Sequence, residues 1–266
     1  MYRIAHFSDF HLSAQDENFD YALDLIDDAI DNDADHIVIS GDIVGSQQMD
    51  VVKAFLTQLS RRKWASADKL TIIPGNHDIY PDLKWKWPAR PDKTFKEFTR
   101  LTRRQRIGER SDSIFSNKQF PFKKTLNKNV VLAGLETTMN GVCSPISFAN
   151  GNLEEEDIDA VTEFFDEHGS AKHKILVCHH YPFDTEFFAI RGLVIVNGGF
   201  TDPEPEIARN WLCHTGASLV LCGHVHENHT KKLGKNCRMV CAGDGQNGKY
   251  YLLDLNTDGT VKIYPQ

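Results

Sequence analysis

The sequence predicts an α/β fold with a largely parallel sheet. Short runs rich in β-branched and apolar residues alternate with longer amphipathic stretches along most of the chain, which is the pattern of strands joined by crossover helices. The chain has 266 residues, of which 41% are hydrophobic and 25% charged, enough for one large domain with its own core. We therefore expect a single domain over residues 1–266.

Nine segments have the composition of strands. The first six are Tyr2–Ser8, His36–Ser40, Leu70–Pro74, Val130–Leu135, Lys174–His179 and Ser218–Gly223. Between them, apolar residues at helical spacing predict three core-facing helices. These residues are Phe19, Leu23, Ile26 and Ile30, then Val52, Phe55, Leu56 and Leu59, then Ile158, Val161, Phe164 and Phe165. After Gly223 we expect an antiparallel meander with a turn at 256–259, formed by Arg238–Ala242, Tyr250–Leu255 and Thr260–Tyr264.

A long basic insertion interrupts this alternation at about residues 79–129. Residues 84–128 contain 14 Lys and Arg against 4 Asp and Glu, a balance of +10 in a chain of net charge −7. The segment also contains Trp85 and Trp87 and a predicted helix over residues 94–107. Because compact folds rarely leave so long an excursion unused, we expect a cap or lid.

The charge of this segment suits an anionic partner, and its sequence leaves several interpretations open. Phe95, Phe98 and Leu101 share one face of the predicted helix, while arginines occupy the others. The helix could be a solvated lid packed on the body, or it could lie at an anionic lipid surface, helped by the two tryptophans. Recognition of a polyanionic substrate and contact with nucleic acid also fit this charge.

Polar residues that can bind metals follow five of the predicted strands. They are Asp9 and His11 in SDFHLS, Asp42 in SGD, Asn76 in PGNHD, His179 in CHH, and His224 and His226 in CGHVH. D-x-H alone carries no weight, but G-N-H-D is expected by chance only about 0.004 times at this composition. Because ligands bind at the carboxyl ends of strands in α/β sheets, the five segments predict one shared site.

This set of side chains predicts a centre of two divalent metal ions. Two carboxylates, an amide oxygen and four imidazoles suit Mn, Fe, Zn or Co better than Mg or Ca. Seven side chains are too many for one ion and enough for two if one carboxylate bridges, and the absence of thiolate excludes a closed structural zinc site. With a bridging hydroxide the centre keeps about one positive charge, which matches a monoanionic phosphodiester.

The motifs D-x-H, G-D, G-N-H-D/E, H and G-H-x-H resemble those of the calcineurin-like metallophosphoesterases, and all are present between Asp9 and His226 without a substitution. The resemblance implies a four-layer α-β-β-α sandwich, here with a basic helical cap insertion. It implies that Asp42 bridges the two ions. It further implies that one ion is held by Asp9, His11 and His226, and the other by Asn76, His179 and His224.

His77 follows Asn76 and is not a ligand in that family. It is therefore placed to act as the general acid that protonates the leaving group after in-line attack by the bridging hydroxide, and Asp78 is expected to orient it. We prefer His179 to His180 as the ligand. His180 could instead contact the substrate or support the metal ligands. No role is assigned to His6, His36, His168, His173, His214 and His229.

The resemblance is greatest to bacterial cyclic nucleotide and glycerophosphodiester phosphodiesterases, so we expect a metal-dependent phosphodiesterase with two ions of Mn, Fe or Zn. Those enzymes usually have less basic material after G-N-H-D. Hydrolases of lipid-linked pyrophosphates of the UDP-diacylglucosamine type carry a basic lid there, though several have Arg where this chain has His77. A nuclease is a further possibility within the hydrolases, and a metal-binding scaffold without turnover is the alternative from another class.

The remaining sequence features predict the surroundings of the protein. No run approaches the roughly 18 apolar residues of a membrane span, and the start MYRIAHFSDFHLS lacks the pattern of a signal peptide. The six cysteines form no CxxC, and several lie within apolar strand-like runs, which indicates packed thiols in a reducing compartment. We expect a soluble cytoplasmic protein that the basic segment could bring to a membrane surface.

Overall fold

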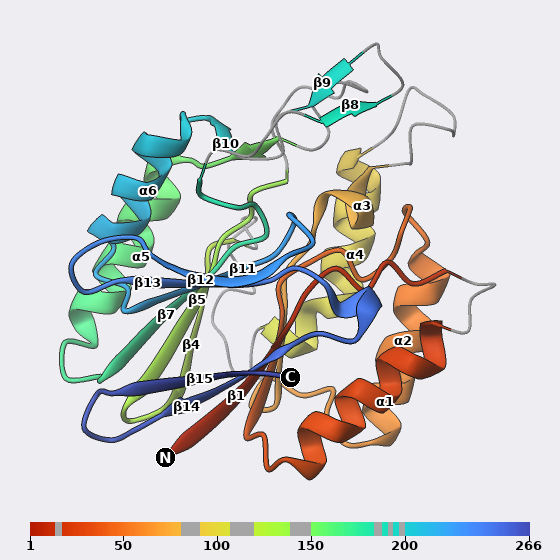
Figure 1. The fold of residues 1–266 in the computed structure, drawn as a ribbon, viewed down its shortest axis with the longest axis horizontal. Helices are drawn as coiled ribbons and strands as arrows, with labels where there is room; N and C mark the ends of the chain where they lie inside the picture. The colour runs from red at the N-terminus through yellow and green to blue at the C-terminus, as the bar shows by residue number, and fades with distance from the viewer. Residues whose placement is uncertain are drawn as a thin grey trace.

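The computed structural model describes residues 1–13, 18–80, 91–106, 120–138, 150–183, 188–190, 194–196 and 200–266. Within these residues two β-sheets lie face to face and helices cover the outer side of each, as Figure 1 shows. The predicted four-layer sandwich is therefore confirmed. No helix among the described residues is long and apolar enough to cross a membrane.

The first sheet has the strand order β15-β14-β1-β2-β3. Its parallel strands are β1 (Tyr2–Phe7), β2 (His36–Ile39) and β3 (Leu70–Ile72), and its antiparallel ones are β14 (Tyr251–Leu255) and β15 (Val261–Pro265). Helices α1 (Asn18–Asp31) and α2 (Met49–Arg61) are the crossovers between the parallel strands. Their apolar faces are buried against this sheet, as the helical spacing predicts.

The second sheet has the order β12-β13-β11-β7-β5-β4. The strands are β4 (Phe122–Asn127), β5 (Val130–Gly134), β7 (His173–Val177), β11 (Leu219–Cys222), β12 (Asn228–Lys232) and β13 (Arg238–Ala242). Helices α5 (Glu155–Glu167) and α6 (Pro205–His214) cover its outer face. Shorter elements are β6 (Gly151–Asn152), β8 (Phe188–Ile190), β9 (Val194–Val196), β10 (Phe200–Asp202), α3 (Asn76–Ile79) and the 3-10 turn η2 (Gly245–Asn247).

The predicted three-stranded meander at the C-terminal end is wrong. β13 pairs in parallel with β11 and antiparallel with β12 in the second sheet, whereas β14 and β15 form a hairpin in the first. The turn of that hairpin lies where it was expected, since the N–H of Gly259 donates to the carbonyl of Asn256. The chain therefore crosses from one sheet to the other between β13 and β14.

The described part of the basic insertion forms helix α4 (Pro91–Arg106), close to the predicted 94–107. α4 packs against α2, α3 and β3, and Phe98 is fully buried in the core of the first sheet. Lys96, Arg100 and Arg103 are exposed. The apolar face of α4 thus covers the body of the protein, while Trp85, Trp87 and residue Ile107 lie outside the described residues.

Candidate metal centre

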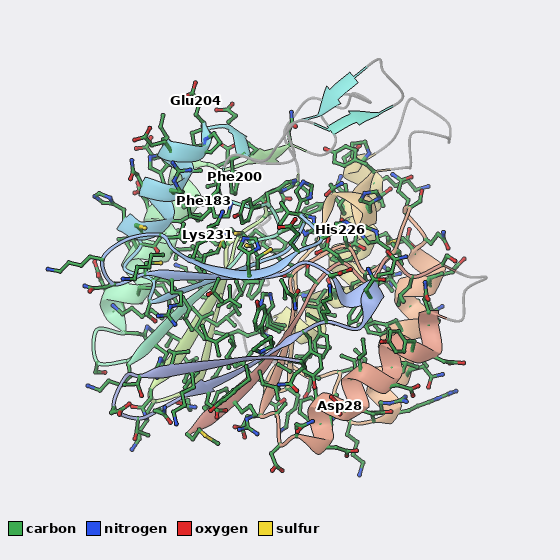
Figure 2. All side chains as sticks on the ribbon, viewed as in Figure 1. Asp28, Phe183, Phe200, Glu204, His226 and Lys231 are labelled. Atoms are coloured by element: carbon green, nitrogen blue, oxygen red, sulfur yellow. The ribbon has the colours of Figure 1, made fainter. Side chains whose placement is uncertain are left out.

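The seven candidate ligands meet at one edge of the sandwich. They follow β1, β2, β3, β7 and β11; the first three strands are parallel to one another in the first sheet, the last two are parallel in the second, and all five end at this edge. His226 lies there in Figure 2, beside the short helix α3. Five motifs that are far apart in the sequence therefore share one site.

Asp9, His11 and His226 form the first group of donors. The Nε2 atoms of His11 and His226 are 3.1 Å apart. Oδ1 of Asp9 lies 3.8 Å from Nε2 of His11 and 3.7 Å from Nε2 of His226. The three ligand atoms surround one point, as a single metal ion requires.

Asn76, His179 and His224 form the second group. Oδ1 of Asn76 is 3.0 Å from Nε2 of His179 and 3.0 Å from Nδ1 of His224, and these two nitrogens are 3.2 Å apart. Oδ2 of Asp42 lies 3.3 Å from Nε2 of His179 and 3.9 Å from Nε2 of His11 in the first group. One carboxylate oxygen of Asp42 thus lies between the two groups.

The donors fit two divalent cations. Oδ2 of Asp42 is buried and accepts no hydrogen bond from the described residues, and ring nitrogens of His11 and His226 face each other. Such a cluster of lone pairs is unfavourable without a shared cation. Nδ1 of His179 bonds the carbonyl of Ser40 at 2.8 Å, which leaves Nε2 as the ligand nitrogen, the arrangement usual for metal-binding histidines.

Electrostatics around Asp42 favour its ionised form. Burial alone would raise its pKa, but the neighbouring histidines, led by His179, hold the pKa well below its usual range. Burial alone would lower the pKa of His179, and Asp42 together with Asp9 and the Ser40 carbonyl instead raises it to about 9. Without a metal, an imidazolium therefore balances the charge of Asp42.

Two further candidate ligands, His11 and His224, are held neutral. Burial lowers the pKa of His11 to about 3 and that of His224 well below its usual value. Burial also raises the pKa of Asp9 to about 6, with a further contribution from Asp42. Neutral imidazole is the form that binds a metal, so burial prepares these side chains as ligands.

The backbone at the ligands is strained. Asp9, His11, Asp42, His224 and His226 all have positive φ, between 47° and 76°. This region is uncommon for residues other than glycine, and such outliers cluster at functional sites. The local conformation that turns each side chain inward is thus maintained by the surrounding structure.

Two motif glycines are required by close approach. A Cβ at Gly75 would lie 2.1 Å from Oδ1 of Asp42, and one at Gly223 would lie 2.4 Å from Oδ2 of Asp9. Either contact would displace a candidate ligand. This explains why glycine precedes Asn76 and His224 in the two motifs.

His77 lies beside the centre and is held at two points, its backbone N–H and its ring. Its N–H donates to Oδ1 of Asp42 at 2.8 Å, and its Nδ1 bonds the carbonyl of Gly45 at 2.9 Å. Its ring stands edge-on to that of His11, with centroids 4.8 Å apart. The buried carboxyl of Asp78, expected to orient His77, instead accepts from the N–H groups of Val44 and Gly75.

Asp78 therefore joins the loops that carry Asp42 and Asn76. Burial and the charge of Asp42 raise the pKa of Asp78 to about 8. The ring of His77 takes its orientation from the Gly45 carbonyl. Every residue has a backbone carbonyl, so the sequence could not predict that the carbonyls of Gly45 and Ser40 orient His77 and His179.

His180 is fully buried behind the second group. Its Nδ1 bonds the hydroxyl of Thr137 at 2.8 Å, and its ring centroid is 4.7 Å from that of His224. Its Nε2 makes no hydrogen bond within the part of the chain that the structure describes. His180 thus packs against the ring of His224, whereas His179 carries its ligand nitrogen into the cluster.

The motifs and the fold agree with comparisons to known proteins. The model of the calcineurin-like phosphoesterase family matches residues 2–228. A dimetal phosphatase from Danio rerio is similar in structure, with a TM-score of 0.68 and 11% identity over 99% of this chain and 95% of that one. No curated protein sequence matches the chain.

Two further solved structures share the fold. A protein from Thermus thermophilus has a TM-score of 0.56 and 18% identity over 99% of this chain and 98% of that one. A purple acid phosphatase from yellow lupin seeds has a TM-score of 0.60 and 11% identity over 100% of this chain and 51% of that one. At such identities the likeness shows the fold alone.

The family match extends from β1 to the first residue of β12. It therefore contains all seven candidate ligands and His77. It spans most of the chain and agrees with the sandwich and with the clustered donors at its edge. The chain belongs to the calcineurin-like phosphoesterase family.

Proposed function

We propose that this metal-dependent phosphohydrolase is a phosphodiesterase in which His77 protonates the leaving group. Two divalent ions of Mn, Fe or Zn would be held by Asp9, His11, Asp42, Asn76, His179, His224 and His226. The observation that carries the proposal is the position of Asp42, whose buried Oδ2 lies between two groups of nitrogen and oxygen donors.

The bound ions supply Lewis-acid stabilisation of phosphoryl oxygens and activate water as a nucleophile. The residues of the chain supply the geometry. Asp42 is fixed by the backbone of His77, and His179 is fixed by the carbonyl of Ser40. The bond from Nδ1 of His77 to Gly45 identifies Nε2 as the nitrogen that would pass a proton to the leaving oxygen.

The charge of the site favours a diester over a more highly charged substrate. Only Asp9 and Asp42 among the seven candidate ligands are carboxylates, so two divalent ions with one bridging hydroxide would leave about one positive charge. A phosphodiester has one negative charge and matches it. The exposed Lys96, Arg100 and Arg103 of α4 would attract such an anion through their long-range field.

The packing of α4 bears on the choice of substrate class. Its apolar face packs against the core of the first sheet. That face is therefore not available to insert into a lipid surface, which argues against an interfacial helix at a lipid substrate. A lipid-linked pyrophosphate hydrolase and a nuclease remain the alternative substrate classes, because the exposed cations of α4 suit any phosphate anion.

The test compares diester and monoester hydrolysis in one protein preparation. We expect Mn-loaded protein to release nitrophenol from bis(p-nitrophenyl) phosphate faster than from p-nitrophenyl phosphate, and a chelator to abolish both. Preference for the monoester would overturn the diester proposal. A panel of cyclic nucleotides, glycerophosphodiesters, UDP-linked lipids and single-stranded DNA would then identify the substrate class.

The scaffold alternative has its own outcome in this test. Two equivalents of tightly bound metal without turnover of any ester, under any of the three metals, would identify a metal-binding scaffold. Metal analysis of the same samples separates this result from a failure to load the centre.

A further inference from the structure

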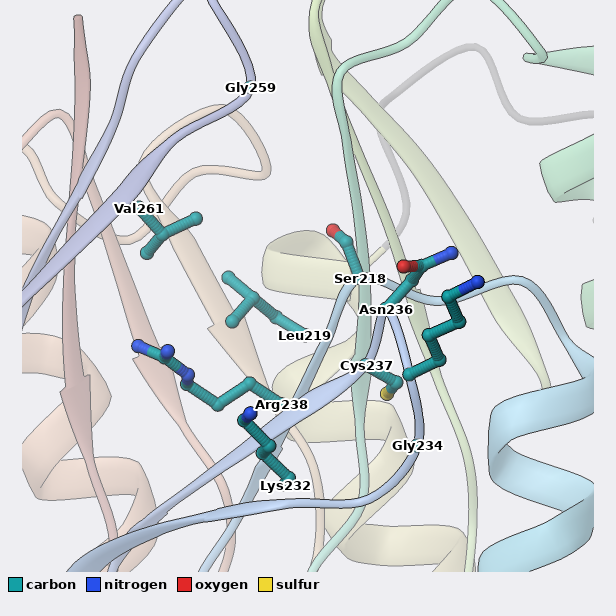
Figure 3. Close-up of a pocket in the computed structure, with 10 residues that line it drawn as sticks. Ser218, Leu219, Lys232, Gly234, Asn236, Cys237, Arg238, Gly259 and Val261 are labelled. Atoms are coloured by element: carbon teal, nitrogen blue, oxygen red, sulfur yellow. The ribbon is translucent and has the colours of Figure 1, made fainter.

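A cavity lies at the end of the sandwich opposite the candidate metal centre, as Figure 3 shows in close-up. It has a volume of about 250 Å³ and is bordered by the amino ends of β11 and β13 and by the turn before β15. β11 and β13 run in parallel toward the metal centre, so a few residues at ~3.3 Å each separate the two sites by on the order of 15 Å. The cavity spans the junction of the two sheets.

The polar lining of this cavity is cationic. Lys232, Lys235 and Arg238 line it, and no Asp or Glu does. Within the described part of the chain none of these three cations forms an ion pair, whereas Arg3 pairs with Asp254 and Lys249 with Asp244. The lining of this cavity is therefore positively charged in a chain of net charge −7.

The segment that surrounds these cations is also rich in Lys and Arg. Residues 228–243, which form β12, its turn and β13, contain four Lys and Arg and no Asp or Glu. Asp258 precedes the lining residue Gly259 and accepts bonds from the N–H and hydroxyl of Thr260 at 2.9 and 2.7 Å. Its carboxylate is thus committed to its own turn.

Two of the cations stand directly opposite each other. Lys232 and Arg238 are register partners on the antiparallel strands β12 and β13, and Figure 3 shows their side chains extending to the same side. Like charges in this cross-strand position repel and destabilise the pairing. An anion between them would reverse that cost, so the arrangement is suited to a bound ligand.

Hydrogen-bond donors complete the cavity. The side chain of Asn236 lies on the other side of the cavity from Lys232 and Arg238, as Figure 3 shows, and the neighbouring Lys235 also lines the cavity. The backbone N–H groups of Lys235 and Asn236 donate no bond within the described residues. Ammonium, guanidinium and amide donors around one small cavity are the groups that bind phosphoryl oxygens.

We propose that this cavity binds a small oxyanion of the phosphate or pyrophosphate class through Lys232, Lys235, Arg238 and Asn236. The site is separate from the candidate metal centre and requires no metal. The ligand is either the free inorganic anion or the phosphate group of a nucleotide. It would touch both sheets, since Gly259 and Val261 of the first sheet form the opposite wall.

The experiment is calorimetric titration of the full chain with inorganic pyrophosphate, before and after removal of metals with EDTA. We expect EDTA-treated wild type to retain one saturable site whose affinity falls as ionic strength rises. The Lys232→Gln, Arg238→Gln double variant is expected to bind at least tenfold more weakly. Lys235→Gln, in the exposed turn, should weaken binding at least threefold and provides a second variant if the double variant folds poorly.

The matched control removes the same charges from another cavity. Lys53 and Arg61 line a cavity against α2, and the Lys53→Gln, Arg61→Gln double variant should change the pyrophosphate affinity less than twofold. Equal affinity of the two double variants, or no saturable binding to EDTA-treated wild type, would overturn the proposal. Because this titration involves no turnover, its failure is distinguishable from failure of the phosphodiesterase proposal.

A second titration with ADP identifies the source of the anion. Affinity for ADP equal to that for pyrophosphate indicates recognition of the phosphates alone, and tighter binding of ADP indicates a nucleotide. Pyrophosphate should also raise the melting temperature of wild type in a concentration-dependent way and have little effect on the Lys232→Gln, Arg238→Gln variant.

Discussion

The backbone N–H of His77 donates a 2.8 Å hydrogen bond to Oδ1 of Asp42. This bond joins the candidate general acid to the carboxylate that lies between the two groups of metal donors. It uses a main-chain donor, so it survives any side-chain substitution at position 77 except proline. The proton-transfer role of His77 can therefore be removed without releasing Asp42.

His77→Ala is expected to keep its metals and to lose activity in proportion to the need for a proton on the leaving group. For a diester with an alkyl leaving group, kcat should fall by about 10²- to 10⁴-fold. For bis(p-nitrophenyl) phosphate the fall should be small, because nitrophenolate leaves without protonation. Steady-state kinetics on both esters, with metal analysis of the same samples, measures this difference.

Asp42→Ala is the matched control, because it should lose metal and activity on both esters together. An equal loss on the two esters in His77→Ala would indicate that His77 positions the substrate instead of donating a proton. Wild-type activity on the alkyl ester would remove His77 from the mechanism altogether.

Gly75→Ala is expected to weaken metal binding without replacing any of the candidate ligands. The added Cβ would lie 2.1 Å from Oδ1 of Asp42 and 2.3 Å from its backbone nitrogen, so Asp42 has to move. Loss of such support typically costs 10- to 100-fold in metal affinity. Competition with a fluorescent chelator measures the change.

Gly45→Ala provides the comparison within the same site. A Cβ there meets only the carbonyl of His11 at 3.5 Å, an ordinary contact, and the Gly45 carbonyl that holds His77 is retained. We expect metal affinity within about twofold of wild type. A similar loss in both variants would mean that the loops respond to any added bulk, and the specific contact with Asp42 would no longer explain the motif glycine.

Much of this fold was predictable because the central strands and helices have clear periodicity. β1, β2, β5, β7 and β11 are apolar runs, and they lie where both faces of the strand are buried. β12 and β4 were missed because they lie at sheet edges and consist mostly of polar residues, as in NHTKK and FKKTLN. Without β12, the sheet of β13 could not be assigned.

The candidate ligands were found because their identity is written in short motifs, whereas their support is not. The carbonyls of Ser40 and Gly45 orient His179 and His77, and any residue offers a carbonyl. The cationic cavity was missed for another reason. Its lining combines the β12–β13 hairpin with the turn before β15, and only the tertiary fold brings these segments together.

Acid is expected to destabilise the protein through histidines that are buried as neutral side chains. Burial lowers the pKa of His6 to about 3, and burial with the nearby Lys124 lowers that of His36 to about 3. In the unfolded chain each titrates near 6.5. The unfolding free energy is therefore unaffected by these two histidines above pH 6.5, and it decreases as the pH falls from 6.5 toward 3 because the unfolded chain binds the protons.

The slope of stability against pH measures this effect. Each such histidine adds about 1.4 kcal/mol per pH unit below pH 6. His36→Gln should reduce the slope of the unfolding free energy between pH 6 and 5 by that amount, and His6→Gln should do the same. Urea unfolding in EDTA keeps the metal ligands equivalent in all three proteins. Parallel slopes would show that these side chains titrate normally in the folded state.

Lys124 is expected to be the cation whose removal costs most stability. It lies on the edge strand β4 of the second sheet, and only 7% of it is exposed. Its ammonium donates to the carbonyls of Ala67 and Leu70 at 3.0 and 2.7 Å and to the hydroxyl of Thr71 at 2.9 Å. These acceptors belong to β3 and the turn before it, so Lys124 joins the two sheets.

Lys124→Met preserves the aliphatic stem but removes the ammonium donor from the carbonyls of Ala67 and Leu70, which should cost about 3 kcal/mol of unfolding free energy. The hydroxyl of Thr71 keeps its contact with Nε2 of His36 at 2.8 Å. The control is Lys123→Met on the adjacent residue, which is exposed and should change stability by less than about 0.5 kcal/mol. Urea unfolding monitored by circular dichroism measures both. Equal stability of the two variants would mean that water replaces the ammonium. In that case packing of the apolar layer between the sheets, and not Lys124, would hold β4 against β3.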